Sequence, residues 1–215
     1  MRTIMLMNAK GGCGKTTLAT NLACWFADQD GKVALADFDP QLSSLDWLEA
    51  RADYEGVPTI QGIDATREAV KPARGTEYLI IDVPAGVHGA EINKMLTRVE
   101  SLIIPVLPSQ IDIRAVKRFL SELLDSGRVS RKQTRVAIVA NRVRENTVAF
   151  HQLEEFLQEL KIPFLTSLRE TQNYLRCAET GLSIFELAPS LVEKDLPQWD
   201  PIIDWLDSRK SLPAG

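Results

Sequence analysis

The segment that most constrains the fold of this chain is Ala9-Lys10-Gly11-Gly12-Cys13-Gly14-Lys15-Thr16-Thr17. It follows an apolar run at residues 4–7 and precedes a helical pattern at residues 18–27. A glycine-rich loop that ends in Gly-Lys-Thr, between a strand and a helix, is the pattern of a phosphate-binding loop. Its glycines allow a tight turn whose N–H groups point inward, and the helix N-terminus adds partial positive charge. The sequence therefore predicts that this loop binds the phosphates of a nucleotide.

Each position of the loop has an expected task. The Lys15 ammonium reaches the β- and γ-phosphates, and the Thr16 hydroxyl binds Mg²⁺. The strict pattern begins with glycine, whereas this chain has Ala9, which is tolerable if its φ is negative. The alternative, a glycine-rich turn that binds nothing, is disfavoured by the strand and helix on either side. The expected nucleotide-binding residues of the loop are Gly11, Gly12, Cys13, Gly14, Lys15, Thr16 and Thr17.

The rest of the chain predicts an α/β fold. Of 215 residues, 45% are hydrophobic and 25% are charged, which is ordinary for a soluble globular protein. Continuous apolar runs at 4–7, 33–36, 79–81, 102–106 and 136–140 alternate with helical patterns at 16–28, 42–51, 90–97, 114–126 and 147–160. Such runs favour a doubly wound, mostly parallel sheet flanked by helices, with ligands at the carboxyl ends of the strands. We expect a single domain over residues 1–215, mostly helical after Phe164, with a closing amphipathic helix at 191–206.

Two acidic motifs follow predicted strands. Asp37 and Asp39 flank Phe38, and alternation in an extended segment puts both carboxylates on one side, with the ring turned into the core. Carboxylates aimed at a triphosphate are useful around Mg²⁺ and an attacking water, although a solvated pair that caps the next helix is the alternative. Asp82 ends the apolar run 79–81 and is suited to contact Mg²⁺ or its waters. We expect Gly86 and Gly89 to form a flexible turn that senses the γ-phosphate.

The second lysine of the loop carries a family resemblance. The run Lys-Gly-Gly-x-Gly-Lys-Thr-Thr from Lys10 resembles the deviant Walker P-loop ATPases of the ParA/MinD superfamily. The resemblance implies that Lys10 crosses a dimer interface to the nucleotide of the other subunit and neutralises charge during phosphoryl transfer. It also implies that Asp37 helps to hold the metal shell and that Asp39 activates the water. The alternative for Lys10 is a solvated loop lysine.

The resemblance extends to later segments. Residues 104–112 are similar to a segment that meets the partner subunit beside the nucleotide. Asn141 follows another strand, where the family places an asparagine on the adenine edge, and Arg142 borders the base. The implied cofactors are ATP and Mg²⁺, the expected catalytic residues are Lys10, Lys15 and Asp39, and the expected metal-site residues are Thr16, Asp37 and Asp82.

The charge distribution suggests a nucleic-acid surface despite a net charge of −4. Residues 114–145 hold nine Lys and Arg against three acids, a local charge of +6. Such a stripe can bind a phosphate backbone, although a merely solvated basic face is the alternative. In the ParA branch, ATP-bound dimers bind DNA without sequence preference. The matching candidates here are Arg142, Arg144, Arg169 and Arg176.

Within the superfamily, Asp39-Pro40-Gln41 and the tail at 181–186 most resemble small, ParF-like partition ATPases. These relatives position plasmids, chromosomes, carboxysomes or chemotaxis clusters, and a ParB-like or analogous partner stimulates hydrolysis. The implied function is an ATP-dependent homodimer that binds non-specific DNA and partitions or positions cargo. Cys13, Cys24 and Cys177 share no metal-ligand spacing, and no signal peptide or membrane-length apolar run is evident, so we expect a cytoplasmic protein, nucleoid-associated when ATP-bound.

Two other function classes remain in view. A MinD-like membrane switch needs a basic amphipathic C-terminal helix, whereas residues 186–207 carry six acids and one lysine. A metabolic ligase of the dethiobiotin-synthetase type shares the fold and the loop, but has no use for Lys10 or for a basic stripe. A nitrogenase-reductase-like cluster protein is excluded because the cysteines lack a suitable pair.

Overall fold

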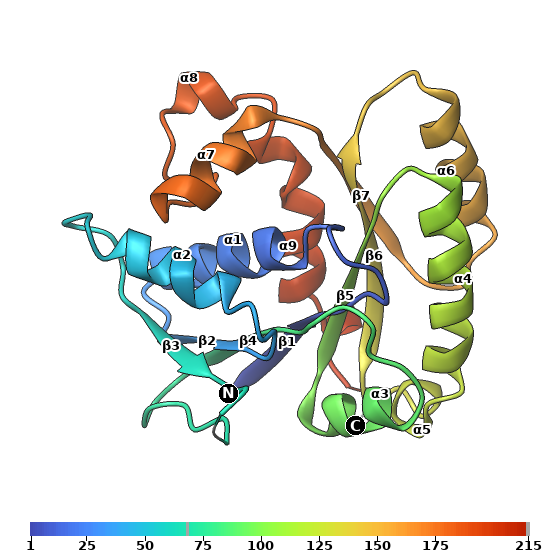
Figure 1. Cartoon of the computed structure of the whole chain (residues 1–215), viewed down its shortest axis with the longest axis horizontal. Coiled ribbons are helices and arrows are strands. Elements are labelled where there is room, and N and C mark those ends of the chain that lie inside the picture. Colours follow the sequence, from blue (N-terminus) through green and yellow to red (C-terminus); the bar gives the residue numbers. More distant parts are fainter. Residues whose placement is uncertain (68, 214–215) are drawn as a thin grey trace.

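A seven-stranded parallel sheet forms the centre of the computed structural model, which describes residues 1–67 and 69–213 (Figure 1). The strand order is β3-β2-β4-β1-β5-β6-β7, and every adjacent pair is parallel. The strands are β1 (Arg2–Leu6), β2 (Val33–Asp37), β3 (Ile60–Asp64), β4 (Tyr78–Asp82), β5 (Ser101–Val106), β6 (Arg135–Val143) and β7 (Phe164–Arg169). All carboxyl ends therefore meet at one edge of the sheet, which confirms the expected doubly wound α/β class.

Helices cover both faces of the sheet, as Figure 1 shows. On one face lie α1 (Lys15–Asp28), α2 (Ser43–Arg51), α7 (Gln172–Thr180), α8 (Pro189–Val192) and α9 (Asp200–Asp207). The other face carries α3 (Ala90–Met95), α4 (Gln110–Leu124), α5 (Gly127–Ser130) and α6 (Val148–Gln158). Short 3₁₀ turns occur at η1 (Leu96–Arg98), η2 (Leu196–Gln198) and η3 (Arg209–Ser211).

The alternation of side chains along each strand divides the core into two layers. In β1, Ile4 and Leu6 belong to the cluster under α1, α2 and α9, whereas Met5 belongs to the cluster under α3, α4 and α6. Successive residues of a strand point to opposite faces, so a strand covered on both sides must be apolar throughout. This requirement explains why the central strands are visible in the sequence as unbroken apolar runs.

The strands missing from the sequence prediction lie at the edges of the sheet. The strands β3 and β7 are the terminal strands of the sheet, and their side chains are mixed or half-exposed. An edge strand packs less apolar surface than a central one, so its sequence lacks a continuous apolar run. The expectation of mostly helical structure after Phe164 therefore missed β7.

The prediction of one continuous closing helix at 191–206 is wrong. The segment forms α8, η2 and α9, with Pro197 and Pro201 each in the first turn of a new element. Proline has no N–H and clashes with the preceding turn, so a single helix cannot run through both positions. The apolar side of α9, including Ile202 and Trp205, is nonetheless buried in the core.

Among the described residues, no helix has the length and apolar character needed to cross a bilayer.

A buried connection joins α2 to the loop after α7. Trp47 Nε1 donates to the Cys177 carbonyl at 3.1 Å, and Arg51 donates to the Gly181 carbonyl at 3.1 Å. The same guanidinium forms a bidentate ion pair with Glu186, the shorter contact being 2.6 Å. Gly181 has φ 72°, and a Cβ there would lie 2.2 Å from the backbone nitrogen of Arg51. The close approach of α2 and α7 therefore requires glycine at this position.

We expect Gly181→Ala to destabilise the fold more than Gly56→Ala. Both glycines have positive φ, and the left-handed region costs any other residue about 1–2 kcal/mol. A Cβ at Gly56 meets nothing within 4 Å, whereas one at Gly181 collides with backbone. The difference in the free energy of unfolding, from urea titrations, should therefore exceed about 1 kcal/mol. Equal losses in the two variants would show that α2 and α7 are not held this closely.

Candidate functional site

The glycine-rich loop lies between β1 and α1 at the carboxyl edge of the sheet. Gly12 has φ 74° and Gly14 has φ 95°, values that favour glycine, whereas Ala9 is not among the described residues with positive φ. The alanine at the first loop position is therefore compatible with the turn. Within the described residues, no side chain caps the N-terminus of α1, and its first turn contains no acidic residue. The free N–H groups and the helix dipole thus remain available to an anion.

Two buried asparagines hold the loop to neighbouring strands. Asn8 donates to the Pro105 carbonyl at 2.6 Å and accepts from the Lys10 N–H at 3.2 Å. Asn141, at the end of β6, donates from Nδ2 to the Cys13 carbonyl at 2.8 Å and accepts from the Arg142 N–H. Within the loop, Lys15 Nζ lies 3.4 Å from the Lys10 carbonyl. Contacts with β5, with β6 and within the loop therefore support this loop conformation.

The carboxylate of Asp82 lies directly beneath the loop. Its Oδ2 accepts from the Thr16 hydroxyl at 2.6 Å and from the Ser44 hydroxyl at 2.7 Å. Its Oδ1 is buried and has no hydrogen-bond partner among the described residues. Burial raises the pKa of Asp82 to about 6, although the two hydroxyl donors oppose the shift. An unpartnered buried carboxylate oxygen beside a P-loop threonine fits a site for a cation or its water shell.

The other acidic pair lies on the neighbouring strand. Asp37 is opposite Asp82 in the β2–β4 register and is fully buried. It accepts from the N–H groups of Asp39 and Ser44, both at 2.9 Å. Burial raises its pKa, and those backbone hydrogen bonds oppose the shift. Phe38 packs against the second core cluster, as alternation predicted.

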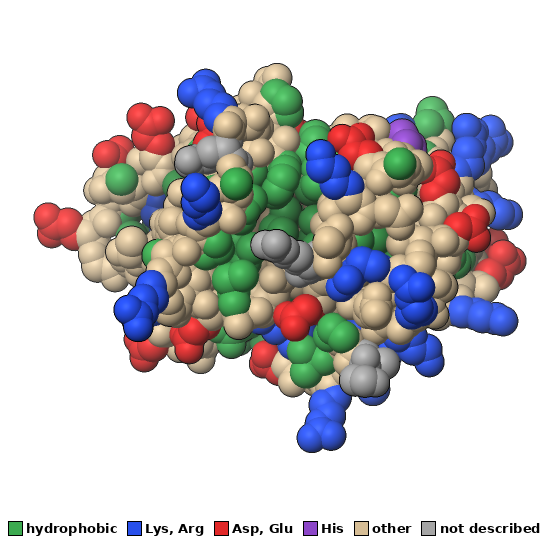
Figure 2. Space-filling view, turned by 90° about the horizontal axis from the view of Figure 1, so that it is seen from below, with side chains coloured by type: hydrophobic (Ala, Val, Ile, Leu, Met, Phe, Trp, Pro, Cys, Tyr) green, Lys and Arg blue, Asp and Glu red, His purple; other side chains and the backbone are tan. Residues whose placement is uncertain are grey.

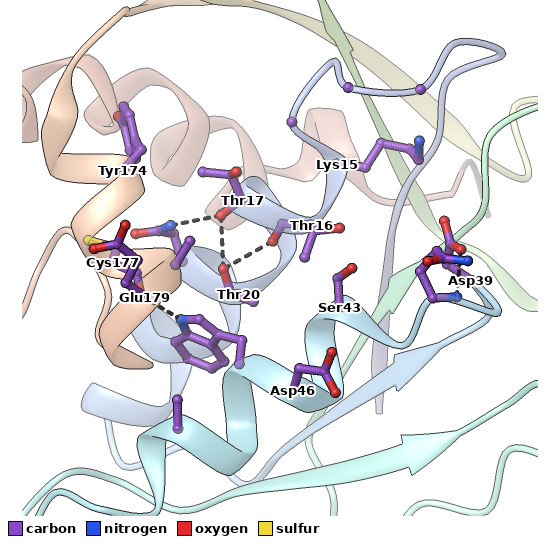
Figure 3. A pocket seen from close by; sticks show the side chains of 18 of the residues that line it. Lys15, Thr16, Thr17, Thr20, Asp39, Ser43, Asp46, Tyr174, Cys177 and Glu179 are labelled. Carbon is purple, nitrogen blue, oxygen red and sulfur yellow. Dashed lines mark hydrogen bonds between the residues drawn. The ribbon is translucent and has the colours of Figure 1, made fainter.

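The position of Asp39 differs from that of its buried neighbour. Its side chain is half-buried and lines the cavity in front of the loop. Figure 3 shows it across the pocket floor from the hydroxyl groups of Thr16 and Ser43. One of its oxygens accepts from the Gln41 N–H at 3.0 Å, which orders the turn before α2. Asp39 can therefore meet a ligand, whereas Asp37 mainly holds the turn that presents it.

Two adjoining cavities extend from the loop. The first, of about 590 Å³, is lined by loop glycines, Lys15, Thr16, Asp39 and parts of α2 and α7. The second, of about 510 Å³, lies between Asn141, Arg142 and residues 170–175. The two share Thr17, Arg142, Tyr174 and Ala178. Together they form an elongated cleft of the size that small-molecule cofactors occupy.

Residues that sequence reasoning missed complete the site. Ser44 joins Asp37 to Asp82, and Asn8 and Tyr174 support the loop and the cavity wall. Asn8 and Tyr174 belong to no recognisable motif, and Ser44 lies three residues after the end of Asp39-Pro40-Gln41. Within the described residues, no group of three or more His, Cys, Asp or Glu side chains is arranged to hold a metal. A cation here would therefore depend on ligand phosphates and water for most of its coordination.

Lys10 is paired with an acid of its own chain. Its Nζ lies 3.6 Å from Asp112 Oδ1, and its side chain is 36% exposed. Asp112 also contacts Ser109, whose hydroxyl caps the N-terminus of α4. The segment that was expected to meet a partner subunit thus holds the second lysine in place. Ile111, next to it, exposes 69% of its surface.

The basic stretch at 114–145 does not form one surface. Strand β6 carries Arg135 at the amino edge of the sheet and Arg142 near the carboxyl edge, so the two ends of the stretch face opposite edges. Figure 2, viewed from below, shows Lys and Arg side chains gathered on the side of α4 and α5. Among the DNA candidates, Arg169 pairs with the buried Asp195 and Arg144 pairs with Glu170. Arg142 and Arg176 are exposed.

The cysteines act as core side chains. Cys13, Cys24 and Cys177 are all buried and free. Burial raises the pKa of each thiol, and Lys15 only partly offsets this effect at Cys13. A thiol with a raised pKa is a poor nucleophile. The three cysteines therefore fill space in the protein interior.

The raised pKa of Asp82 predicts a pH-dependent effect of Asp82→Asn on stability. The ordinary Asp value is 3.8 and the folded value is about 6, so the folded state binds more protons between these values. The stabilisation that comes from protonation of Asp82 in the folded state is fully present below pH 3.8. It is lost as the pH rises through 6. The free energy of unfolding of Asp82→Asn, relative to that of the unmodified protein, should therefore increase from acidic to neutral pH. Both proteins are measured without nucleotide or metal. Asp53→Asn, at an exposed carboxylate, is the control; a pH-independent difference for Asp82→Asn would contradict the assignment.

Comparison with known proteins identifies the family. Residues 4–184 match the family model described as the CobQ/CobB/MinD/ParA nucleotide binding domain. The maintenance of carboxysome distribution protein A of Halothiobacillus neapolitanus is 29% identical over 191 residues, which cover 86% of this chain and 87% of that protein.

Two solved structures share the fold. A plasmid partition protein of Borrelia burgdorferi B31 bound to AMPPNP superposes with a TM-score of 0.72 at 17% identity, covering 94% of this chain and 98% of its own. The structure of pNOB8 ParA bound to nonspecific DNA has a TM-score of 0.54 at 22% identity, covering 75% and 76%. The family match spans the loop, both acidic motifs and Asn141, and the chain therefore belongs to the CobQ/CobB/MinD/ParA family of nucleotide-binding P-loop ATPases.

Proposed function

We propose that this protein is an ATP-dependent switch that dimerises on ATP, binds DNA without sequence preference and positions a cargo. The observation that carries the proposal is the grouping of Lys15, Thr16 and Asp82 at an elongated cleft, with the additional Lys10 at the mouth of the same loop. Lys10 has no role in a P-loop enzyme that works as a monomer. The family match and the nucleotide-bound fold relative support ATP as the ligand.

The two cavities suit the two halves of ATP. The phosphates would lie in the first cavity, on the N–H groups of residues 11–17 and the Lys15 ammonium. The base would extend into the second cavity, between Arg142, Tyr174 and Leu175. Tyr174 and Leu175 supply aromatic and apolar surface for the base, and most of the other lining residues are polar. This assignment leaves the γ-phosphate facing Asp39 and α2.

Thr16 and Asp82 are the proposed residues of a magnesium site. Thr16 donates its proton to Asp82, so its oxygen lone pairs remain available to a cation, and Asp82 Oδ1 is free to accept from a bound water. Magnesium at this place would neutralise phosphate charge as the terminal phosphoryl group leaves. Asp37 would hold the turn and the outer metal shell, and Asp39 would orient the attacking water.

Dimerisation would complete the site. Lys10 is held by Asp112 in the single chain, and it must leave that carboxylate to reach a second nucleotide. Exposed apolar side chains surround this edge, including Ile111, Val148 at the start of α6, and Leu175 of α7. Such exposure at the rim of a cleft is typical of an interface with another protein. Hydrolysis by the single chain should accordingly be slow.

DNA binding is assigned to the carboxyl edge, where the exposed Arg142 and Arg176 lie near the nucleotide cleft. Arg144 would contribute after leaving Glu170, whereas Arg169 is already neutralised by the buried Asp195. The DNA-bound fold relative supports this activity. The proposed cargo is a plasmid, a chromosome or a protein assembly, with a ParB-like or analogous adaptor that stimulates hydrolysis. The proposed location is the cytoplasm, on the nucleoid while ATP is bound.

Two substitutions separate nucleotide binding from turnover. Lys15→Ala should abolish ATP binding, because the buried ammonium at the loop is lost. Asp39→Ala should retain ATP binding and lose roughly 10²-fold or more in turnover, because the water is no longer oriented. Calorimetry and phosphate release measure the two effects, and Asp53→Ala, outside the site, is the control. Normal turnover by Asp39→Ala would overturn its assigned role.

A charge-reversal pair tests which edge of the sheet binds DNA. Arg176→Glu, on α7, should weaken binding of the ATP-bound protein to a random duplex and reduce the salt slope by about one for each lost phosphate contact. Arg131→Glu, after α5 at the opposite edge, should leave binding nearly unchanged. Anisotropy with ATP, ADP and no nucleotide across a salt series measures both. A larger effect of Arg131→Glu would move the DNA site to the other edge.

The two rival functions are disfavoured by specific observations. A membrane switch needs a free amphipathic tail, but the apolar residues of α9 are buried in the core and its exposed residues include acids. Sedimentation with anionic liposomes tests this alternative.

A carboxylate-phosphorylating ligase would turn over only with its second substrate. ATP hydrolysis and ATP-driven dimerisation without any carboxylate substrate would exclude that reaction class.

A further inference from the structure

Asn141 contacts the phosphate-binding loop through the amide nitrogen of its side chain. It is 3% exposed, and Nδ2 donates to the Cys13 carbonyl at 2.8 Å. The amide also lies against Gly14, where an added Cβ would come within 2.0 Å of Nδ2. Gly14 is the N-cap residue of α1 and has the left-handed conformation. Asn141 therefore contacts the loop at the place where its backbone turns into the helix.

The backbone around Asn141 directs the amide toward the loop. The pairing of β6 with β7 is irregular between Ala140 and Val143, and Arg142 has φ 52°. The Arg142 N–H donates to Asn141 Oδ1 at 2.9 Å, which fixes the orientation of the amide. With Oδ1 engaged on this side, Nδ2 is the atom presented to the Cys13 carbonyl.

A second asparagine provides a matching contact at the other end of the loop. Asn8 is fully buried, accepts from the Lys10 N–H and donates to the Pro105 carbonyl of β5. The segment between Lys10 and Cys13 is thus held from β5 on one side and from β6 on the other. A loop that is already ordered loses less conformational entropy when phosphates bind.

We propose that Asn141 is a positioning residue for the phosphate-binding loop and contributes to affinity for the phosphates, rather than to the choice of base. The inference rests on the proposed function, because it assumes that ATP is the ligand. It differs from the role that the family resemblance implies, in which this asparagine recognises adenine. Base recognition is left to the walls of the second cavity, where Arg142, Tyr174 and Leu175 lie.

Inorganic tripolyphosphate separates the two roles, because it has phosphates but no base. Affinities of ATP, GTP and tripolyphosphate, each with Mg²⁺, are measured by competition against a fluorescent ATP analogue. Asn141→Ala should weaken all three by a similar factor, about tenfold, because the Cys13 carbonyl loses its buried donor. Asn141→Asp retains the side-chain volume against Gly14 but cannot donate and adds negative charge, so its loss should be larger. The ratio of ATP to GTP affinity should remain that of the unmodified protein.

Controls separate this effect from general destabilisation. Asn93→Ala makes the same chemical change at an exposed position of α3 and should leave all affinities unchanged. Phe119→Leu reduces packing in the buried middle of α4 and should lower the melting temperature without changing tripolyphosphate affinity. The unmodified protein tests the proposed function itself, since failure to bind ATP would overturn that function and not the assignment of Asn141.

The decisive observation is which of the three ligands bind more weakly to Asn141→Ala. Parallel losses for ATP, GTP and tripolyphosphate, with an unchanged ATP to GTP ratio, support loop positioning. Unchanged tripolyphosphate affinity with a collapsed ATP to GTP ratio makes Asn141 a base-recognition residue and overturns the inference. Unchanged affinity for all three ligands overturns it as well.

Discussion

The buried carboxylate of Asp82 is the contact on which the rest of the site depends. It ends the central strand β4 and binds Thr16 of α1 and Ser44 of α2, so three elements meet at one side chain. Desolvation opposes its ionisation, and the cost is offset only in part by the two hydroxyl donors. This balance fits a residue that also serves a bound cation, because a cation restores the lost solvation of the charge. In the proposed function, a metal–nucleotide complex at this site would offset part of this desolvation cost.

A second feature is that several cationic side chains considered for nucleotide or DNA binding are paired with carboxylates of the same chain. Lys10 is held by Asp112, Arg144 by Glu170 and Arg169 by Asp195. The Arg144–Glu170 pair is exposed at both side chains, so its net contribution to stability is small and it can exchange partners. Asp112 is only 9% exposed, but it also contacts Ser109 and therefore keeps a hydrogen bond when Lys10 leaves. The pair at Arg169 involves a carboxylate with no exposure, so separating it would leave a buried charge alone. Exposure therefore separates the exchangeable contact of Arg144 from the structural contact of Arg169.

Much of the fold follows from patterns along the chain. Continuous apolar runs identified β1, β2, β4, β5 and β6, because strands covered on both faces must be apolar throughout. The edge strands β3 and β7 escaped detection since one side of each is open to solvent. The closing helix was overextended because its apolar spacing continued through Pro197 and Pro201, where the backbone breaks. The spacing of apolar residues indicates which side of a segment is buried. It does not indicate where the hydrogen bonds along a helix end.

By itself, the sequence determined the phosphate-binding loop, the parallel sheet and the carboxylates at the strand ends, because these depend on local backbone freedom and on which residues must be buried. Only the tertiary structure decided which partners those groups have. The contacts between Asn141 and Cys13, Ser44 and Asp82, and Lys10 and Asp112 join residues far apart in the chain. The splitting of the basic stretch between two edges also follows from the direction of β6. Such pairings arise from the register and order of strands, which no local pattern of residues specifies.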